Sequence, residues 1–169
     1  MSSANTALSS SQALLVSVFA LHNLEEIMSI GREAALYESH LSALGIDRSW
    51  YRQDRMVLAT GLLTALSHGL SRNIDHPANT RQAFLGTAVA GALGGNALSH
   101  MGRALKDRRY NGGLATSVVM VPVALQVLRS VKKRDLLTGR QVAAAAVTGN
   151  ALALPLIVLA LTAARKALR

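Results

Sequence analysis

Five long apolar runs, separated by short segments rich in Arg and Lys, constrain the fold of this chain most strongly. The runs lie at about residues 10–30, 56–70, from 83, 114–128 and 142–164. An α-helix needs about 20 apolar residues to cross some 30 Å of hydrocarbon. Half of the 169 residues are hydrophobic, 16% are charged, and the mean hydropathy is +0.28. The sequence therefore predicts a single all-α domain over residues 1–169, a polytopic membrane bundle of about five transmembrane helices.

The net charge of +9 raises the question of nucleic-acid binding. The basic residues form short clusters between apolar runs, such as Lys132-Lys133-Arg134, rather than one soluble basic face. Clusters of this kind suit anionic lipid headgroups, so we expect membrane lipids as partners and no nucleic acid. The chain has no cysteine, which excludes disulfides, thiolate metal sites and a thiol nucleophile.

The segment after the first run has features of the membrane–water boundary. Leu36, Tyr37, Leu41 and Leu44 recur at helical spacing among polar residues, which predicts an amphipathic helix in the interface, ended by Gly45. Trp50 and Tyr51 lie beside arginines, as aromatic anchors do. The excess of Lys and Arg after the first and third runs and at the C-terminus predicts a cytoplasmic C-terminus and an outside N-terminus.

Small residues mark one face of the third run. Gly86, Ala90 and Gly94 repeat every four residues, and Gly91 and Gly95 form a Gly-x-x-x-Gly. Without side chains at these positions, a neighbouring helix can approach the backbone closely. We interpret these glycines as packing residues, since no strand precedes them as a dinucleotide fingerprint requires.

Ionisable residues inside the first run are the strongest indication of function. His22, Glu25 and Glu26 fall on one helical face within one turn. A charged group at a bilayer centre costs about 2.5–3.5 kcal/mol, so such groups usually face the bundle interior and mark a site. With five spans, the first and third run in the same direction, which predicts that Asn96 and His100 lie at the same height and share an inner cavity with this motif.

The His22-x-x-Glu25-Glu26 motif resembles the signature of the HXXEE family of bacterial membrane proteins. Two further elements agree with it, namely Asn96-x-x-x-His100 and Tyr110-x-x-Gly113 followed by Thr116. The family often has Pro before that glycine, where this chain has Gly112. The resemblance covers roughly residues 14–122. It implies a shared site but no reaction, because the family has no settled activity.

The residue types allow three functions. Paired carboxyls beside imidazoles suit acid/base catalysis, so the first hypothesis is a membrane-embedded enzyme that isomerises or cyclises a lipophilic small molecule. In it Glu25 or Glu26 is the acid, His22 or His100 the base, and Asn96 orients the substrate. The candidate substrate-binding residues are Tyr110, Thr116, His68 and Asn150.

The same residues also suit a metal. In this second hypothesis the protein is a metal-dependent membrane hydrolase, in which His22, Glu25, Glu26 and His100 bind one Zn, Mn or Fe ion. The acid/base version needs no cofactor. A third hypothesis is a non-enzymatic lipid-binding or proton/ion-coupled transport protein, and homo-oligomer formation stays open.

Overall fold

The computed structural model describes residues 11–41, 45 and 47–168, without the side chains of 31–41 and 48. This part of the chain is all-α, as predicted, and contains no strand. Its elements are α1 (Ser11–Leu41), the short 3-10 helix η2 (Arg48–Tyr51), α2 (Gln53–Ser71), α3 (Thr80–Asp107), α4 (Leu114–Lys133) and α5 (Gly139–Ala167).

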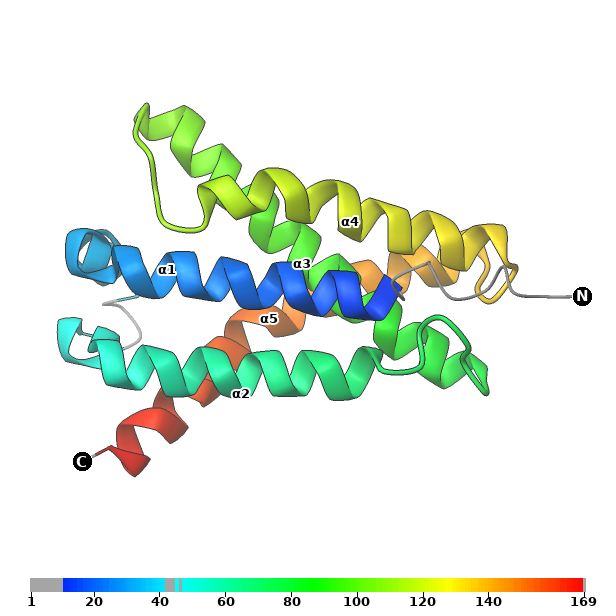
Figure 1. Ribbon diagram of the computed structural model, residues 1–169, viewed down its shortest axis with the longest axis horizontal. Coiled ribbons are helices and arrows are strands. Elements are labelled where there is room, and N and C mark those ends of the chain that lie inside the picture. Colours follow the sequence, from blue (N-terminus) through cyan, green and yellow to red (C-terminus); the bar gives the residue numbers. More distant parts are fainter. Residues whose placement is uncertain (1–10, 42–44, 46, 169) are drawn as a thin grey trace, which may run out of the picture.

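The five α-helices alternate in direction along the long axis of the molecule (Figure 1). Helices α1, α2 and α4 lie along this axis, and α3 and α5 cross behind them at an angle. Helix α1 packs on α2 and α4, while α3 packs on α4 and α5. As predicted, α1 and α3 run in the same direction, so their C-terminal halves lie at the same end of the bundle.

Two helices are longer than the sequence predicted. Helix α1 continues past Ile30 to Leu41, so the predicted interfacial helix is a continuation of α1, and its side chains lie outside the described residues. Helix α3 continues to Asp107, into the basic segment after the third run that the sequence predicts to be a loop, because Ala104, Leu105 and Lys106 are good helix formers. The next residue, Arg108, has a left-handed φ of 50°, and the helix ends there.

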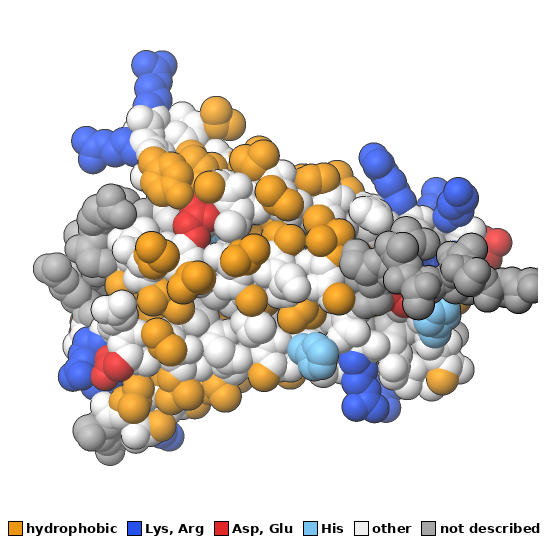
Figure 2. All heavy atoms as spheres, in the orientation of Figure 1, with side chains coloured by type: hydrophobic (Ala, Val, Ile, Leu, Met, Phe, Trp, Pro, Cys, Tyr) orange, Lys and Arg blue, Asp and Glu red, His pale blue; other side chains and the backbone are white. Residues whose placement is uncertain are grey.

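Within the described residues, three helices are long and apolar enough to cross a membrane. These candidate spans are Ser11–Ile30, Leu114–Lys133 and Gly139–Ala167. Helix α2 begins with Gln53, Asp54 and Arg55, and α3 is rich in glycine, which lowers the hydropathy of both. Figure 2 shows hydrophobic side chains over the middle of the molecule and basic ones toward its two ends. These features are consistent with a membrane protein, and the five-span topology stays a prediction.

Of the small residues predicted to pack on α3, Gly91 and Gly95 lie against α5, whereas Gly86 lies against Ile74 and Gly94 against Ala124 of α4. A Cβ at Gly91 would lie 2.4 Å from Ala146 Cα, and one at Gly149 would lie 1.9 Å from Ala88 O. Asn150 Nδ2 donates across this contact to Gly91 O at 3.0 Å and, within α5, to Ala146 O at 2.9 Å. The α3–α5 contact therefore requires glycine, as the spacing predicted.

The predicted aromatic anchors lie where α1, α2 and α5 meet. Tyr51 is buried in an apolar cluster with Ile30 and Leu161, and burial raises the pKa of its hydroxyl to about 12. The guanidinium of Arg165 lies 4.7 Å from the centre of the Trp50 ring. These contacts tie η2 to the C-terminal end of α5.

Candidate functional site

The structure brings the predicted His/Glu motif together with residues of α3 and α4. Helix α1 provides His22, Glu25 and Glu26, and α3 provides Asn96 and His100. Both imidazoles are buried, with exposed fractions of 0% and 1%, whereas the Glu26 side chain is 17% exposed. The rings of His22 and His100 meet edge to face, with centroids 4.8 Å apart.

Both nitrogens of the His22 ring have a defined partner. Asn96 Nδ2 lies 3.0 Å from His22 Nε2, and since an amide nitrogen donates, Nε2 is the acceptor. His22 Nδ1 then carries the ring hydrogen and donates to Thr116 Oγ1 at 3.0 Å. This arrangement fixes the orientation of the ring and directs the lone pair of Nε2 into the cluster.

Asn111 orients the second imidazole in the same way. Its Nδ2 donates to the backbone oxygen of His100 at 2.9 Å, which turns its Oδ1 toward His100 Nδ1, also at 2.9 Å. Because the amide oxygen accepts, His100 Nδ1 carries the hydrogen and Nε2 has the lone pair. Both imidazoles therefore present an unprotonated Nε2.

The carboxyl of Glu26 faces both of these nitrogens. Its Oε1 lies 3.1 Å from His100 Nε2 and 3.8 Å from His22 Nε2. Ligand atoms of all three residues lie within 4.8 Å of one another. Asn96 satisfies the lone pair of His22 Nε2, but His100 Nε2 and Glu26 Oε1 face each other at 3.1 Å as two acceptors. A proton or a cation between these two atoms would relieve their repulsion.

Arg103 places a positive charge beside the His100 ring. Its Nη2 lies 3.1 Å from Nδ1 and 3.2 Å from Nε2 of that imidazole. Because Nη2 is nearly equidistant from the two ring nitrogens, it lies over the face of the ring rather than along the in-plane lone pair of Nε2. The positive charge of Arg103 would therefore oppose a cation bound to Nε2 without occupying its lone pair.

Glu25 lies next to this cluster and contacts α4 instead. Its two carboxylate oxygens accept from Tyr110 Oη, from the backbone amides of Ala115 and Thr116 at 3.0 and 2.9 Å, and from Thr116 Oγ1 at 2.6 Å. The metal-compatible group of His22, Glu26 and His100 does not include it. The two adjacent glutamates thus have different surroundings.

Two glycines before α4 leave room for the cluster. Gly113 has a φ of 86°, and a Cβ there would lie 2.4 Å from His22 Cε1 and 3.0 Å from His100 Cε1. A Cβ at Gly112 would lie 1.8 Å from Ser29 Oγ. Both imidazoles therefore pack directly on the backbone of this turn. A larger residue at Gly113 would push the turn away from the two rings.

The other predicted site residues divide into two groups. Tyr110 and Thr116 adjoin the cluster through Glu25. His68 lies at the opposite end of α1, with its Nδ1 3.0 Å from Gln12 Nε2, and Asn150 lies in the α3–α5 contact. His68 and Asn150 therefore lie away from the cluster, so the structure does not bring these two predicted substrate-binding residues to it.

Asn111 and Arg103 were not singled out from the sequence. Asn111 precedes two glycines, and Asn-Gly is typical of a turn, so its side chain gave no separate indication. The sequence predicts that Arg103 lies in a basic loop after the third run. In the structure α3 continues past Arg103, and the spacing of three residues places Arg103 and His100 on one face of the helix.

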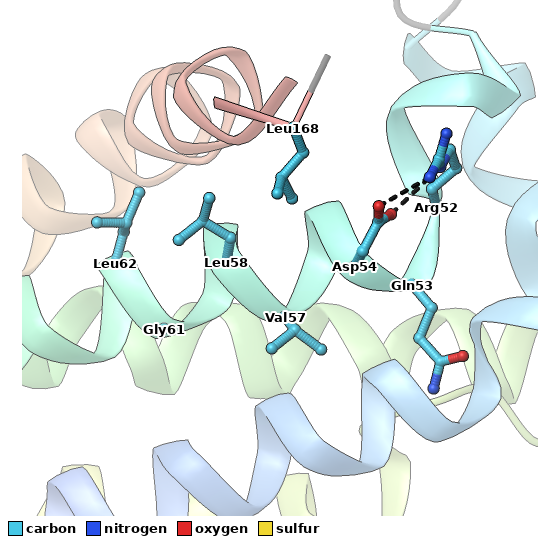
Figure 3. Close-up of a pocket in the computed structure, with 8 residues that line it drawn as sticks. All are labelled: Arg52, Gln53, Asp54, Val57, Leu58, Gly61, Leu62 and Leu168. Carbon is cyan, nitrogen blue, oxygen red and sulfur yellow. Dashed lines mark hydrogen bonds and ion pairs between the residues drawn. The ribbon is translucent and has the colours of Figure 1, made fainter. Parts of the chain in front are cut away.

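Two grooves of the molecule lie away from the cluster. One runs between α2 and the end of α5 and includes Val57, Leu58, Leu62 and Leu168, with the ion pair of Arg52 and Asp54 at its polar end (Figure 3). The other lies on α4 around Pro122 and Arg129. Within the cluster both imidazoles are buried, and Glu26 and Asn96 are partly exposed.

The fold and the site define a class: an all-helical protein with apolar helices of membrane-spanning length and an internal His/Glu cluster joining α1, α3 and α4. Residues 13–127 match the model of the HXXEE family, described as a protein of unknown function with HXXEE motif, and the chain belongs to this family. This match confirms the resemblance inferred from the motifs. Neither the curated proteins nor the solved structures returned a match.

Proposed function

We propose that the protein is a membrane-embedded metalloenzyme that binds one divalent cation through His22, Glu26 and His100 and acts on a lipophilic small molecule. The observation that carries this proposal is the convergence of three acceptor atoms, each Nε2 at 3.1 or 3.8 Å from the same carboxylate oxygen. Without a cation or proton between His100 Nε2 and Glu26 Oε1, this arrangement is unfavourable in an apolar environment.

The distances between these atoms suit a metal. In a tetrahedral site with bonds of about 2.0–2.1 Å, neighbouring ligand atoms are about 3.3 Å apart. The two separations from Glu26 Oε1, 3.1 and 3.8 Å, lie on either side of this value. The ligand atoms as a set lie within 4.8 Å of one another, so binding would draw them closer together. Two imidazoles and one carboxylate are the ligands of several catalytic zinc sites and of non-haem iron sites. Such an ion would supply Lewis-acid polarisation of a substrate oxygen.

The contacts behind the ligands support the same proposal. Histidines that bind metals usually donate their other ring hydrogen to an oxygen, which fixes the tautomer. Here His22 Nδ1 has Thr116 Oγ1 and His100 Nδ1 has Asn111 Oδ1, at 3.0 and 2.9 Å. Both imidazoles are thus arranged for ligation through Nε2.

A lipophilic substrate is supported by the surface around the two glutamates. Leu21, Leu24 and Met28 of α1 and Val118 of α4 are exposed. Figure 2 shows an acidic side chain among hydrophobic ones over α1 and the start of α4. In a membrane this surface faces acyl chains, so a substrate would approach from the bilayer between these helices. We expect a bacterial inner membrane and an outside N-terminus.

Acid/base catalysis without a metal is the second candidate, and one distance favours it. His100 Nε2 and Glu26 Oε1 are 3.1 Å apart, which is a hydrogen-bond length if one proton lies between them. A proton shared in this way could be exchanged with a substrate during isomerisation or cyclisation. Activity that persists after chelation would favour this candidate.

Zn²⁺ titration of the protein purified in detergent tests the metal site. We expect one ion per chain, and Glu26→Gln should weaken binding at least about 100-fold, more than the loss of a ligand's hydrogen-bond partner usually does. Asp107→Asn is the control, because it removes an exposed carboxylate at the end of α3. Equal affinities of wild type and Glu26→Gln would contradict the proposal.

Incubation with bacterial lipid extracts, followed by mass spectrometry, tests the enzyme. We expect a lipid product that depends on wild-type protein and is absent with Glu26→Gln. Stoichiometric Zn²⁺ binding with no change in any lipid would contradict catalysis and favour the non-enzymatic alternative.

A further inference from the structure

Helix α4 begins without a capping side chain of its own. Its N-cap residue is Gly113, and the amides of the second and third helical residues, Ala115 and Thr116, bond to Glu25 instead. We propose that Glu25 is a positioning residue, which caps α4 and holds the His22 imidazole through the Thr116 hydroxyl, whereas Glu26 is the metal ligand. The metal-ligand part rests on the proposed function.

The packing of the imidazoles explains why the cap comes from another helix. An N-cap is normally Ser, Thr, Asp or Asn, whose side chain accepts from these amides. Gly113 cannot be replaced by such a residue, since a Cβ there would lie 2.4 Å from His22 Cε1. Glu25 therefore supplies both the acceptor and the negative charge that favour a helix N-terminus.

The Thr116 hydroxyl connects this cap to the site. It has one hydrogen, which it donates to Glu25 Oε2 at 2.6 Å, so its lone pair faces His22 Nδ1 at 3.0 Å. His22 must then keep its ring hydrogen on Nδ1 and present Nε2 toward Glu26. The first glutamate of the motif thereby determines how the histidine of the motif is oriented.

Substitutions of Thr116 separate this role from helix capping. Thr116→Val removes the hydroxyl but keeps the backbone amide that Glu25 caps. We expect Zn²⁺ affinity to fall about 10–100-fold with little change in thermal stability, and Thr116→Ser to restore it. Thr162→Val is the matched control, since its hydroxyl bonds to Val158 O on α5, away from the cluster. Wild-type affinity in Thr116→Val would overturn the proposal.

Glu25→Gln should lower both stability and Zn²⁺ affinity, because one of its terminal atoms becomes a donor that α4 cannot use. The ¹⁵N shifts of the His22 ring in metal-free protein provide an independent test. Because Asn96 also holds this hydrogen on Nδ1, the spectra are compared in the Asn96→Leu background. There we expect the hydrogen on Nδ1 with Thr116 and with Thr116→Ser, and a shift toward Nε2 with Thr116→Val.

These two measurements distinguish the two proposals. If wild type binds no Zn²⁺ but the ring hydrogen moves with Thr116→Val in the Asn96→Leu background, the metal centre fails and the positioning role stands. An unchanged tautomer with Thr116→Val in this background would overturn the positioning role even if wild type binds Zn²⁺.

Discussion

The α3–α5 contact and the His/Glu cluster both place polar side chains between apolar helices, yet they differ in how hydrogen bonds are satisfied. In the α3–α5 contact, Asn150 Nδ2 donates to two backbone oxygens, and glycines let the helices approach. Donors and acceptors match, so the contact needs nothing further. Such bonds are worth about 0.6–1.7 kcal/mol between membrane helices.

In the cluster, acceptors face one another. His22 Nε2, His100 Nε2 and Glu26 Oε1 converge within 4.8 Å. Asn96 satisfies the first of these atoms, but His100 Nε2 and Glu26 Oε1 present lone pairs to each other at 3.1 Å. Selection for stability alone would not favour this arrangement, because apolar side chains in place of the cluster would avoid the repulsion between its acceptor atoms. The comparison shows that the first region holds the helices together, and it supports the proposal that the second binds a cation.

The largest expected effect is on the free energy of unfolding and concerns the α3–α5 contact. Gly91→Ala places a Cβ 2.4 Å from Ala146 Cα, and backbone cannot yield easily. We expect the free energy of unfolding to fall by about 3 kcal/mol, measured by unfolding in mixed micelles, while the folded protein keeps its Zn²⁺ affinity. Gly102→Ala on the same helix meets nothing within 4 Å and should be neutral or stabilising. Equal stability of the two variants would contradict close packing.

A substitution in the His/Glu cluster should lower the affinity for Zn²⁺. Asn111→Leu removes the acceptor of His100 Nδ1, so Zn²⁺ affinity should fall about 10–100-fold by titration. Asn111→Asp keeps an oxygen acceptor at this position and should retain most of the affinity. If both variants bind Zn²⁺ as wild type does, Asn111 does not orient a ligand.

Asn150→Ala should have a smaller effect, confined to stability. It removes two hydrogen bonds to backbone oxygens, which predicts a loss of about 1 kcal/mol in the free energy of unfolding. Zn²⁺ affinity should not change, and in the double variant with Asn111→Leu the two effects should add. Loss of Zn²⁺ affinity in Asn150→Ala would show that the two regions are coupled.

The smallest expected effect is a gain. Arg103→Gln removes a positive charge 3.2 Å from His100 Nε2, so affinity for Zn²⁺ should rise several-fold. Lys106→Gln, which removes an exposed charge one turn further along α3, should leave the affinity unchanged. A decrease in Arg103→Gln would mean that the guanidinium supports the ligand set rather than competing with a cation.

The sequence was sufficient to predict which helices form and which ends of them meet. Alternating spans require α1 and α3 to run in the same direction, and this brings His22 to Asn96 and Glu26 to His100. Helix spacing also identified the glycines that pack on α5. These predictions depend on periodicity and chain direction, which a sequence records directly.

The division between Glu25 and Glu26 could not be predicted in this way. Adjacent residues on a helix differ by about 100° in direction, and only the position of α4 determines which of them reaches its first turn. The partners of the imidazoles, Thr116 and Asn111, likewise depend on how the turn at Gly113 folds. The separate interfacial helix was wrong because nothing after Ile30 interrupts α1 before Leu41.

X-ray absorption spectroscopy of the Zn²⁺-loaded protein in detergent tests the central claim most directly. The account predicts one bound ion per chain with nitrogen and oxygen ligands, two of them imidazoles, and loss of one imidazole contribution in His100→Ala. An ion that is not retained in stoichiometric amount, or a coordination shell without imidazole, would contradict the metal centre.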